Sequence, residues 1–468
     1  MARMTTPEVP SRLRSLFRSK FVRDTLALQI GKIGVTASTL LAAFLVARLL
    51  GVQAYGVWAL AQSLFSIAQV FDLTGIVVST STTLPMAVGA KDQKRVLDLL
   101  AVYVKIMAVW ALILLVGLMI AAPRIAAASY GDSRAGVLAA TLALAVLPDA
   151  LYNLVITTLQ SQRAMTLLAG FQNVNQFTLL VCTAGALVIS PTPEGMVGAR
   201  LVYSVTTMAM ALWLYQRQRR RYEVPYPAMG EIAQRALRIS PRPFLGFGLL
   251  NALDKKVANL YTEIPLQLVG IYAGTAAAGY LELGFKALSI PALLGSALFD
   301  NLQAVVPQAV GRGDFARLRR DMLRIVIGLA AAAVLFYSVF ALLVPVFVPL
   351  LFGAAWTLAV PVVVTLAVYG AVTLVGGVFG PLYRALNLLR PILAIKVGAL
   401  LVILPGLWLL TQIGAVESAW QVNGLLAPTI PVLEQNGAVV GAWIVNGLMM
   451  VSVGLTVAVS LTALSSRD

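Results

Sequence analysis

The residues best suited to chemistry are lysines and carboxylates that interrupt long apolar segments. Lys255, Lys256, Asn259 and Glu263 fall on one face of a helix at about 100° per residue. An ionisable side chain at membrane depth costs about 2.5–3.5 kcal/mol on insertion scales, and it usually faces a cavity or a partner. This face predicts a water-filled cavity that attracts anions, with a self-neutralising Lys–Glu pair as the structural alternative.

Further polar side chains lie in the neighbouring apolar segments. Glu282 and Lys286 are four residues apart, which is the spacing of an ion pair within a helix. We take as candidate substrate-binding residues the cations and polar side chains Lys32, Lys255, Lys256, Lys286, Asn259, Gln62 and Gln69. The candidates for coupling or gating are Asp72, Glu263, Glu282 and Arg48. Each has a structural alternative: Lys32 can snorkel to the headgroups, Arg48 can anchor the end of its helix, and the glutamines can mediate helix packing.

Several kinds of site are excluded by the composition. The chain has no histidine and a single cysteine, Cys182. A Ser-His-Asp triad, a histidine-ligated metal site, a thiolate cluster and an intrachain disulfide are therefore absent. We expect no metal and no organic cofactor. Transport is expected to couple to a gradient of protons, sodium or chloride through carboxylates or an inorganic ion.

The apolar segments predict an all-α membrane protein. Of the 468 residues 59% are hydrophobic and 12% charged, and the mean hydropathy is +0.87. Crossing a hydrocarbon core of ~30 Å needs about 20 apolar residues. Twelve stretches meet this need, at 24–50, 56–84, 99–122, 136–159, 166–190, 196–216, 243–270, 275–306, 322–351, 356–384, 391–413 and 437–464.

The net charge of +16 is interpreted as a topology signal. Twenty-five of the 35 lysines and arginines fall in loops on one side of the predicted membrane, and two fall in loops on the other. The positive-inside rule places both termini in the cytoplasm. No nucleic acid partner is expected. The basic N-terminus lacks a short apolar region with a cleavage site, so the first span is expected to be retained.

Two phrases occur twice in the chain. P-x-A-V-G-x-x-D-x-x-R runs from Pro85 to Arg95 and again from Pro307 to Arg317, and G-x-x-A-x-G begins at Gly51 and at Gly274. Lys32 and Lys255 precede these glycines by the same nineteen residues. A duplicated half in an apolar chain is typical of two-lobed transporters. Because each half would hold six spans, the repeats are predicted to be parallel.

The predicted organisation has five parts. They are a basic cytoplasmic tail at 1–23, an N-lobe at 24–216, a basic cytoplasmic linker at 217–242, a C-lobe at 243–464 and a short tail at 465–468. Residues 87–97 and 309–319 are expected to form amphipathic connectors. Residues 411–436 are expected to form the one long exterior loop.

The stretch from Arg48 to Gly56, R-L-L-G-V-Q-A-Y-G, resembles the R-x-L-G-x-x-x-Y-G phrase of Wzx-type polysaccharide flippases. F-D-L-T-G at residues 71–75 is similar to their F-D-L-G pattern with an inserted threonine, and Gly270-Ile271-Tyr272 also fits. These flippases belong to the multidrug/oligosaccharidyl-lipid/polysaccharide exporter superfamily. The resemblance implies twelve helices in two six-helix lobes that form a V around a central cavity built mainly from spans 1, 2, 7 and 8.

The same resemblance implies the function. It is the alternating-access flipping of an undecaprenyl-diphosphate-linked oligosaccharide across the bacterial inner membrane, for O-antigen, capsule or exopolysaccharide assembly. The lipid tail would stay in the bilayer between spans 1 and 8. The partners implied are the lipid-linked oligosaccharide, the lipid bilayer and polysaccharide assembly proteins.

Three alternatives remain open at this point. A multidrug/toxin extrusion antiporter would move cations, which a lysine-lined cavity repels. A lipid II flippase usually has two more helices than the twelve predicted. A membrane glycan polymerase or ligase would be an enzyme with exterior acidic, arginine or histidine groups, whereas residues 411–436 contain only Glu417 and Glu434 as charged residues. We therefore expect a transporter and not an enzyme.

Overall fold

The structure, a computed structural model, describes residues 34, 38–39, 41–72, 75–162, 164–221, 225–241, 249–313, 315–422 and 430–466. Within these ranges the regular secondary structure is helical throughout. After a helical stretch at Leu41–Leu50, the first half contains α3 (Val52–Val70), α4 (Ile76–Gly89), α5 (Gln93–Tyr130), α6 (Arg134–Leu142), η1 (Ala143–Ala145), α7 (Val146–Ser161), α8 (Met165–Ile189), α9 (Pro193–Gln218) and α10 (Met229–Arg238). The second half contains α11 (Leu249–Arg312), α12 (Phe315–Phe352), η3 (Ala354–Ala359), α13 (Val360–Gly376), α14 (Phe379–Ala385), α15 (Leu389–Ala399), η4 (Leu400–Val402), α16 (Ile403–Val422) and α17 (Ile430–Ser465).

Nine helical segments of the described residues are long and apolar enough to cross a membrane. Eight of them coincide one to one with predicted spans. The ninth, Ala252–Leu288, joins the seventh predicted span to part of the eighth, because the helix assignment continues through a bend at Gly274. The second predicted span is divided into α3 and α4, and most of the first lies outside the described residues.

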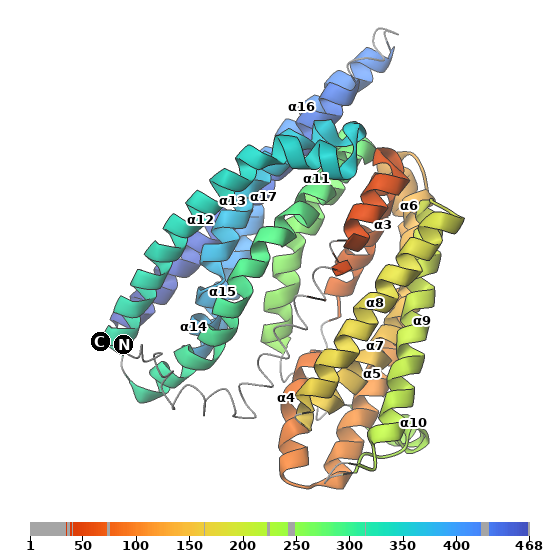
Figure 1. The fold of residues 1–468 in the computed structure, drawn as a ribbon, viewed down its shortest axis with the longest axis vertical. Coiled ribbons are helices and arrows are strands. Elements are labelled where there is room, and N and C mark those ends of the chain that lie inside the picture. Colours follow the sequence, from red (N-terminus) through yellow and green to blue (C-terminus); the bar gives the residue numbers. More distant parts are fainter. Residues whose placement is uncertain are drawn as a thin grey trace, which may run out of the picture.

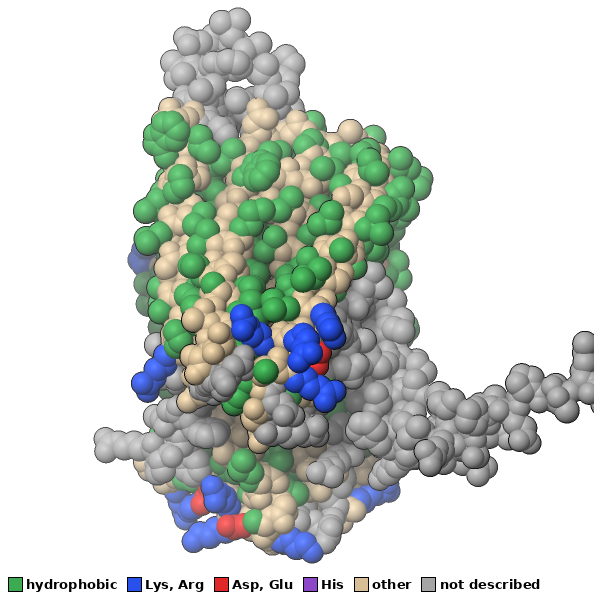
Figure 2. All heavy atoms as spheres, turned by 90° about the vertical axis from the view of Figure 1, so that its left-hand side faces the viewer, with side chains coloured by type: hydrophobic (Ala, Val, Ile, Leu, Met, Phe, Trp, Pro, Cys, Tyr) green, Lys and Arg blue, Asp and Glu red, His purple; other side chains and the backbone are tan. Residues whose placement is uncertain are grey.

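The helices form two lobes (Figure 1). One lobe contains α3 to α10 and the other contains α11 to α17, and the two are in contact where α3 packs against α11. They lie close together at the end marked by α6 and diverge towards α10 and α14. The face of the second lobe that Figure 2 shows is broadly apolar, with its lysine and arginine side chains gathered towards one end. The predicted all-α, two-lobed membrane fold is confirmed.

The repeated phrases have the same backbone geometry in both halves. Gly51 (φ 74°, ψ 169°) and Gly274 (φ 84°, ψ 172°) both occupy a left-handed conformation that an L side chain rarely adopts. In the phrase that runs from Pro85 to Arg95 and again from Pro307 to Arg317, the equivalent residues Lys91 and Gly313 also have positive φ angles, of 56° and 76°. The repeat therefore specifies equivalent bends in the two lobes.

The prediction of amphipathic connectors at 87–97 and 309–319 is wrong. The first segment is a tight corner between α4, which ends at Gly89, and α5, which begins at Gln93. Asp92 caps α5 by accepting a hydrogen bond from the Arg95 backbone N–H at 2.9 Å. The second segment has a corner at the equivalent place, between Arg312 and Phe315. A residue with positive φ at each corner, and the capping Asp92 at the first, reduce the connection between the helices to a few residues.

The expected exterior loop at 411–436 is also wrong. α16 continues to Val422 and α17 begins at Ile430, so helix fills most of this range, and 423–429 lie outside the described residues. Few charges and no proline interrupt the chain before Pro428, and Pro431 lies in the first turn of α17, where its missing N–H breaks no helical hydrogen bond.

The described part of the basic linker, residues 217–221 and 225–241, contains a helix that packs against the N-lobe. Ile232 and Ala236 of α10 are buried against the N-lobe. Arg235 makes an ion pair of 2.6 Å with Asp98 on α5, and Lys105 donates to the Ile239 carbonyl at 2.9 Å. α10 is thus an amphipathic helix fixed to the base of the N-lobe.

Candidate functional site

The two lobes meet through the repeated glycines. A Cβ placed on Gly56 would lie 1.8 Å from the Thr275 carbonyl oxygen, and one on Gly279 would lie 3.0 Å from the Val52 carbonyl oxygen. Val52 and Thr275 are themselves 223 residues apart, as are the two glycines. α3 and α11 therefore approach each other about a local pseudo-twofold axis, with backbone against backbone.

Hydrogen bonds close the same end of the molecule. Thr275 donates to the Gln53 side chain, and Arg48 donates to the Leu351 carbonyl at 3.1 Å. The Trp356 indole is buried and donates to the Ala47 carbonyl at 3.1 Å. These bonds join helices of opposite lobes. Arg48, a gating candidate, therefore holds the lobes together at this end.

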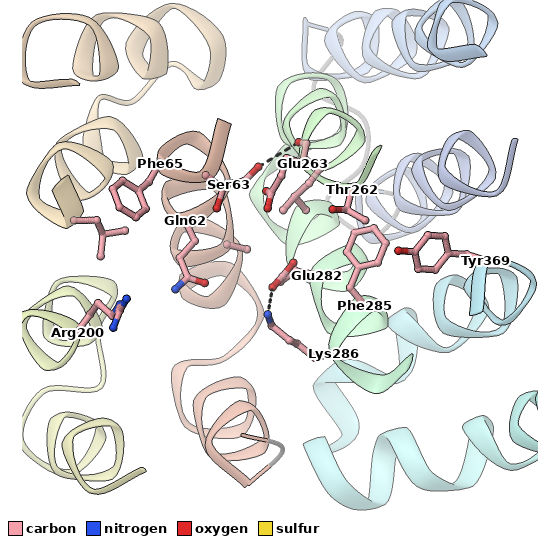
Figure 3. A pocket seen from close by; sticks show the side chains of 14 residues that line it. Gln62, Ser63, Phe65, Arg200, Thr262, Glu263, Glu282, Phe285, Lys286 and Tyr369 are labelled. Atoms are coloured by element: carbon pink, nitrogen blue, oxygen red, sulfur yellow. Dashed lines mark hydrogen bonds and ion pairs between the residues drawn. The ribbon is translucent and has the colours of Figure 1, made fainter. Parts of the chain in front are cut away.

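A polar cavity of about 360 Å³ lies beyond this contact (Figure 3). Gln62 of α3 and Arg200 of α9 lie on one side, and Glu282 and Lys286 of α11 lie on the other. The remaining lining comes from both lobes and comprises Ala59, Ser63, Phe65, Ser66, Leu142, Thr262, Glu263, Leu266, Phe285 and Tyr369. The cavity is thus shared between the lobes.

Charged groups of both signs face the cavity. The Glu282–Lys286 ion pair predicted from its spacing is confirmed at 3.0 Å. Arg200 makes an ion pair of 2.5 Å with Asp149 on α7. The Ser63 hydroxyl donates to the Glu263 backbone carbonyl at 3.2 Å, and no described lysine or arginine comes within 4.0 Å of the Glu263 carboxylate. Each cation of the described lining therefore has its own counter-ion.

An apolar cleft of about 540 Å³ adjoins the polar cavity. Its walls are the 41–50 helix, α11 and α12, and its lining contains Leu41, Ala43, Phe44, Ala287, Phe340, Leu343, Val344, Phe347, Val348, Leu351, Phe352 and Val363. Leu41, Leu343 and Phe347 are 44–47% exposed, so the cleft opens on the lipid-facing surface. Lys286 lines the cleft as well as the polar cavity. Lys286 therefore marks the junction of the two spaces.

The predicted site residues separate into two groups. Gln62, Glu263, Glu282 and Lys286 line the polar cavity. The second group, Lys256, Asp72 and Gln69, joins the lobes nearer the end at which lysine and arginine side chains gather (the basic end). Lys256 lies 3.5 Å from the Asp72 carboxylate and donates to the Gln69 carbonyl. Lys256 does not form the self-neutralising Lys–Glu pair given as the structural alternative, because its carboxylate partner lies across the lobe interface.

The remaining predicted residues do not line the described cavity. Lys255 and Asn259 are exposed on α11, and Lys32 lies outside the described residues. The cationic character of the whole cavity stays a prediction.

Sequence reasoning missed Arg200 and Asp254. Arg200 lies in the sixth predicted span and its partner Asp149 in the fourth, and no spacing along the chain indicates that the two meet. Asp254 is 1% exposed and receives hydrogen bonds from Tyr383 at 2.8 Å and from Lys396 at 2.5 Å.

The cavity is suited to binding a charged, hydroxyl-rich molecule. Cations that already have carboxylate partners can exchange them for a phosphate, while amide and hydroxyl side chains hydrogen-bond to sugars. Among the described residues no three His, Cys, Asp or Glu side chains converge as a metal site. The arrangement is that of a binding cavity.

Comparisons with known proteins support this reading of the fold. The family described as polysaccharide biosynthesis protein matches residues 45–361. An inward-facing multidrug resistance MATE family transporter of the MOP superfamily is 14% identical over 92% of this chain and 96% of that chain, with a TM-score of 0.66. A MOP superfamily transporter from Pyrococcus furiosus, described as having a binding pocket of reverse polarity, is 16% identical over 95% of each chain, with a TM-score of 0.58.

An outward-facing multidrug resistance MATE family transporter is 15% identical over 96% of each chain, with a TM-score of 0.57. No curated protein matches the chain significantly. These structural likenesses establish the fold.

Proposed function

Because this chain belongs to the polysaccharide biosynthesis protein family, we propose that it flips an undecaprenyl-diphosphate-linked oligosaccharide across the bacterial inner membrane. The family and the fold are those of a multi-pass membrane transporter. The transported unit would supply the assembly of O-antigen, capsule or exopolysaccharide, with both termini of the chain in the cytoplasm.

The observation that carries the proposal is the junction at Lys286. A lipid-linked oligosaccharide has a polar glycan, an anionic diphosphate and an apolar tail, in that order. The polar cavity, the Lys286 ammonium group and the lipid-facing cleft follow one another in the same order. The glycan would occupy the cavity, the diphosphate would lie against Lys286, and the tail would leave through the cleft between the 41–50 helix and α12.

Anion binding at Lys286 would proceed by exchange of partners. In the described conformation Glu282 neutralises Lys286 and Asp149 neutralises Arg200. A diphosphate carries more charge than one carboxylate, and charges interact more strongly in a space of low dielectric constant. Binding would release Glu282, which would become available to a proton or a sodium ion. This exchange offers a route for coupling to an ion gradient.

Alternating access would require the lobes to separate where they are now joined. At one end the joint is the contact between Gly56 and Thr275, and nearer the basic end it is the Lys256–Asp72 pair. Movement of α3 against α11 would open and close access from either side. The bound headgroup would then cross the membrane while the lipid tail remained in the bilayer.

The experiment is the complementation of a strain that lacks its own polysaccharide flippase. Surface polysaccharide is measured and normalised to the amount of inserted protein. Lys286→Gln should reduce export severely, because it removes the cation at the junction. The double variant Glu282→Gln/Lys286→Gln should be equally defective, although it restores neutrality within the helix.

The double variant distinguishes a role of Lys286 in substrate binding from a role of the ion pair in the stability of α11. If the ion pair served only the stability of α11, removing both charges together would restore export towards the parental level. Recovery of that kind, or full export by Lys286→Gln alone, would refute the assignment of the junction.

A cation antiporter is the second candidate function. The observation in its favour is Glu263, whose carboxylate faces the cavity with no described lysine or arginine within 4.0 Å. An antiporter should expel a cationic dye such as ethidium from intact cells, and Glu263→Gln should abolish the efflux. Efflux by the parental protein together with normal export by Lys286→Gln would favour this candidate over the flippase.

A further inference from the structure

An apolar groove lies on the outside of the N-lobe, away from the cavity between the lobes. It has a volume of about 640 Å³ and runs between α8 and α9. Its lining comprises Thr166, Leu167, Gly170, Phe171, Val174, Met210, Trp213 and Leu214. The volume falls within the range of about 300–1,000 Å³ that is usual for sites of small organic ligands.

The groove owes its depth to the absence of a side chain at Gly170. A Cβ placed on this glycine would meet no atom within 4 Å, so the position opens into free space. Val174 and Trp213, which flank it, are 47% and 59% exposed. α8 is among the least buried spans of the described chain, and its apolar face is turned towards the surroundings of the protein.

A run of arginines follows Trp213 of the groove at the C-terminal end of α9. The guanidinium carbon of Arg217 lies 5.2 Å from the centroid of the Trp213 ring, and Arg219, Arg220 and Arg221 follow within the next turn. Trp213 is about 7.5 Å from the end of α9 at ~1.5 Å per residue, which is a suitable depth for an aromatic ring at a membrane interface.

These arginines differ from Arg200 and Arg235 in their counter-ions. Arg200 and Arg235 have carboxylate partners at 2.5 and 2.6 Å. For Arg217 and the following Arg219, Arg220 and Arg221, no carboxylate among the described residues comes within 4.0 Å. Positive charge therefore accumulates at one end of an apolar groove, at headgroup depth. A phospholipid with a negative headgroup has the complementary arrangement of charge and apolar chain.

We propose that this groove binds an anionic phospholipid of the leaflet that faces the arginine-rich end. One acyl chain would lie along Gly170 between α8 and α9, and the phosphate would contact Arg217, which the Trp213 ring holds in place. Such a lipid would pack against the described outer surface of α8. The site is separate from the transport cavity and needs no lipid-linked sugar.

The test is native mass spectrometry of the purified full-length protein titrated with phosphatidylglycerol or phosphatidylcholine. The parental protein should retain one phosphatidylglycerol molecule more tightly than phosphatidylcholine. Gly170→Leu should weaken the binding of both lipids, because its side chain fills the groove without a clash. Gly185→Leu is the matched control, since it lies on the same helix, outside the groove and also in open space, and it should bind both lipids as the parent does.

Arg217→Gln isolates the electrostatic part and leaves the groove intact. It should lower the affinity for phosphatidylglycerol about fivefold, which corresponds to ~1 kcal/mol for one basic residue near an anionic surface, and leave phosphatidylcholine unchanged. Equal affinity of the parent for the two lipids would overturn the proposal, as would unchanged binding by Gly170→Leu. Cross-linking of position 174 to a co-purifying membrane protein would also overturn it, because the groove would then belong to a protein partner.

Discussion

The contact between the repeated glycines provides the sharpest quantitative prediction. We consider Gly56→Ala, with Gly279→Ala as its symmetry-related control. The new methyl group at Gly56 would lie 1.8 Å from the Thr275 carbonyl oxygen, and at Gly279 it would lie 3.0 Å from the Val52 carbonyl oxygen. Real Cβ atoms almost never approach another atom closer than 3.0 Å. The first substitution therefore forces the two helices apart by about 1 Å or more, while the second needs only a small adjustment.

The expected magnitude follows from the cost of overpacking, which is typically about 1–3 kcal/mol. Both substitutions gain the same helix propensity, up to ~1 kcal/mol, so this contribution cancels in the comparison. If the clash is relieved when the lobes separate at this end, an energy of about 1–3 kcal/mol shifts the conformational equilibrium by about 5- to 150-fold. Gly56→Ala should thus populate the state that is open at the Gly51 end, and Gly279→Ala should resemble the parent.

The assay uses a cysteine at Gln62, a lining residue of the polar cavity, in a background where Cys182 is replaced by alanine. An impermeant maleimide is added to intact cells, and the labelling rate is normalised to inserted protein. The rate should rise in Gly56→Ala and stay near the parental rate in Gly279→Ala. Equal rates in the parent and in folded, inserted Gly56→Ala would falsify the assignment of this contact as a gate. Equal effects of the two substitutions would contradict the geometry on which the prediction depends.

Three further predictions concern the rest of the chain. Asp254→Asn should lower the stability of the purified protein by about 3–5 kcal/mol, because it leaves Lys396 without its buried counter-ion. Tyr383→Phe, which removes a hydrogen bond to the same carboxylate, should cost only about 1.5–3 kcal/mol. Similar thermal unfolding of the two variants would contradict this. Lys256→Gln and Asp72→Asn should change export to the same extent, and their double variant should add little; additive losses would mean that the 3.5 Å pair is not a functional unit. In intact cells a cysteine at Ser129 should react with an impermeant maleimide and one at Ser161 should not, and the reverse result would invert the topology.

The sequence indicated the duplicated backbone features better than it indicated the partners of the charged residues. Gly51 and Gly274 have positive φ angles, and Gly56 and Gly279 lie at the backbone contact between the lobes. Both situations demand glycine, and the requirement is the same in both lobes. Eight spans were predicted correctly because a membrane helix needs one long apolar segment and little else. Residues 411–436 were predicted to be a loop, but most of them are helical, because a helix that extends beyond the apolar core does not need apolar residues.

The partners of intramembrane charges were harder to predict. Glu282 and Lys286 lie on the same helix, so their spacing was sufficient. For Lys256 the sequence offered a cavity position or, as the alternative, a Lys–Glu pair on its own helix, but its carboxylate partner Asp72 lies on the other lobe. Which charged residues pair depends on how the two lobes approach each other, and a single sequence gives no information on the distances between helices. The partners of Arg200 and Asp254 also lie on other helices.

The two halves share their backbone bends and the residues of their contact, but they differ in the charged side chains at the cavity. The bends and the close contact recur at an offset of 222 or 223 residues, as do Lys32 and Lys255. At that offset Glu282 corresponds to Ala59 and Lys286 to Ser63, so the ion pair at the cavity is present in one lobe only. A symmetric pair of bends lets the lobes rock about a common contact, while an asymmetric charge fixes where a bound anion lies. The apolar cleft borders α11 and α12 on the same side as Lys286, so a substrate with one charge and one tail has a single orientation in which both are accommodated.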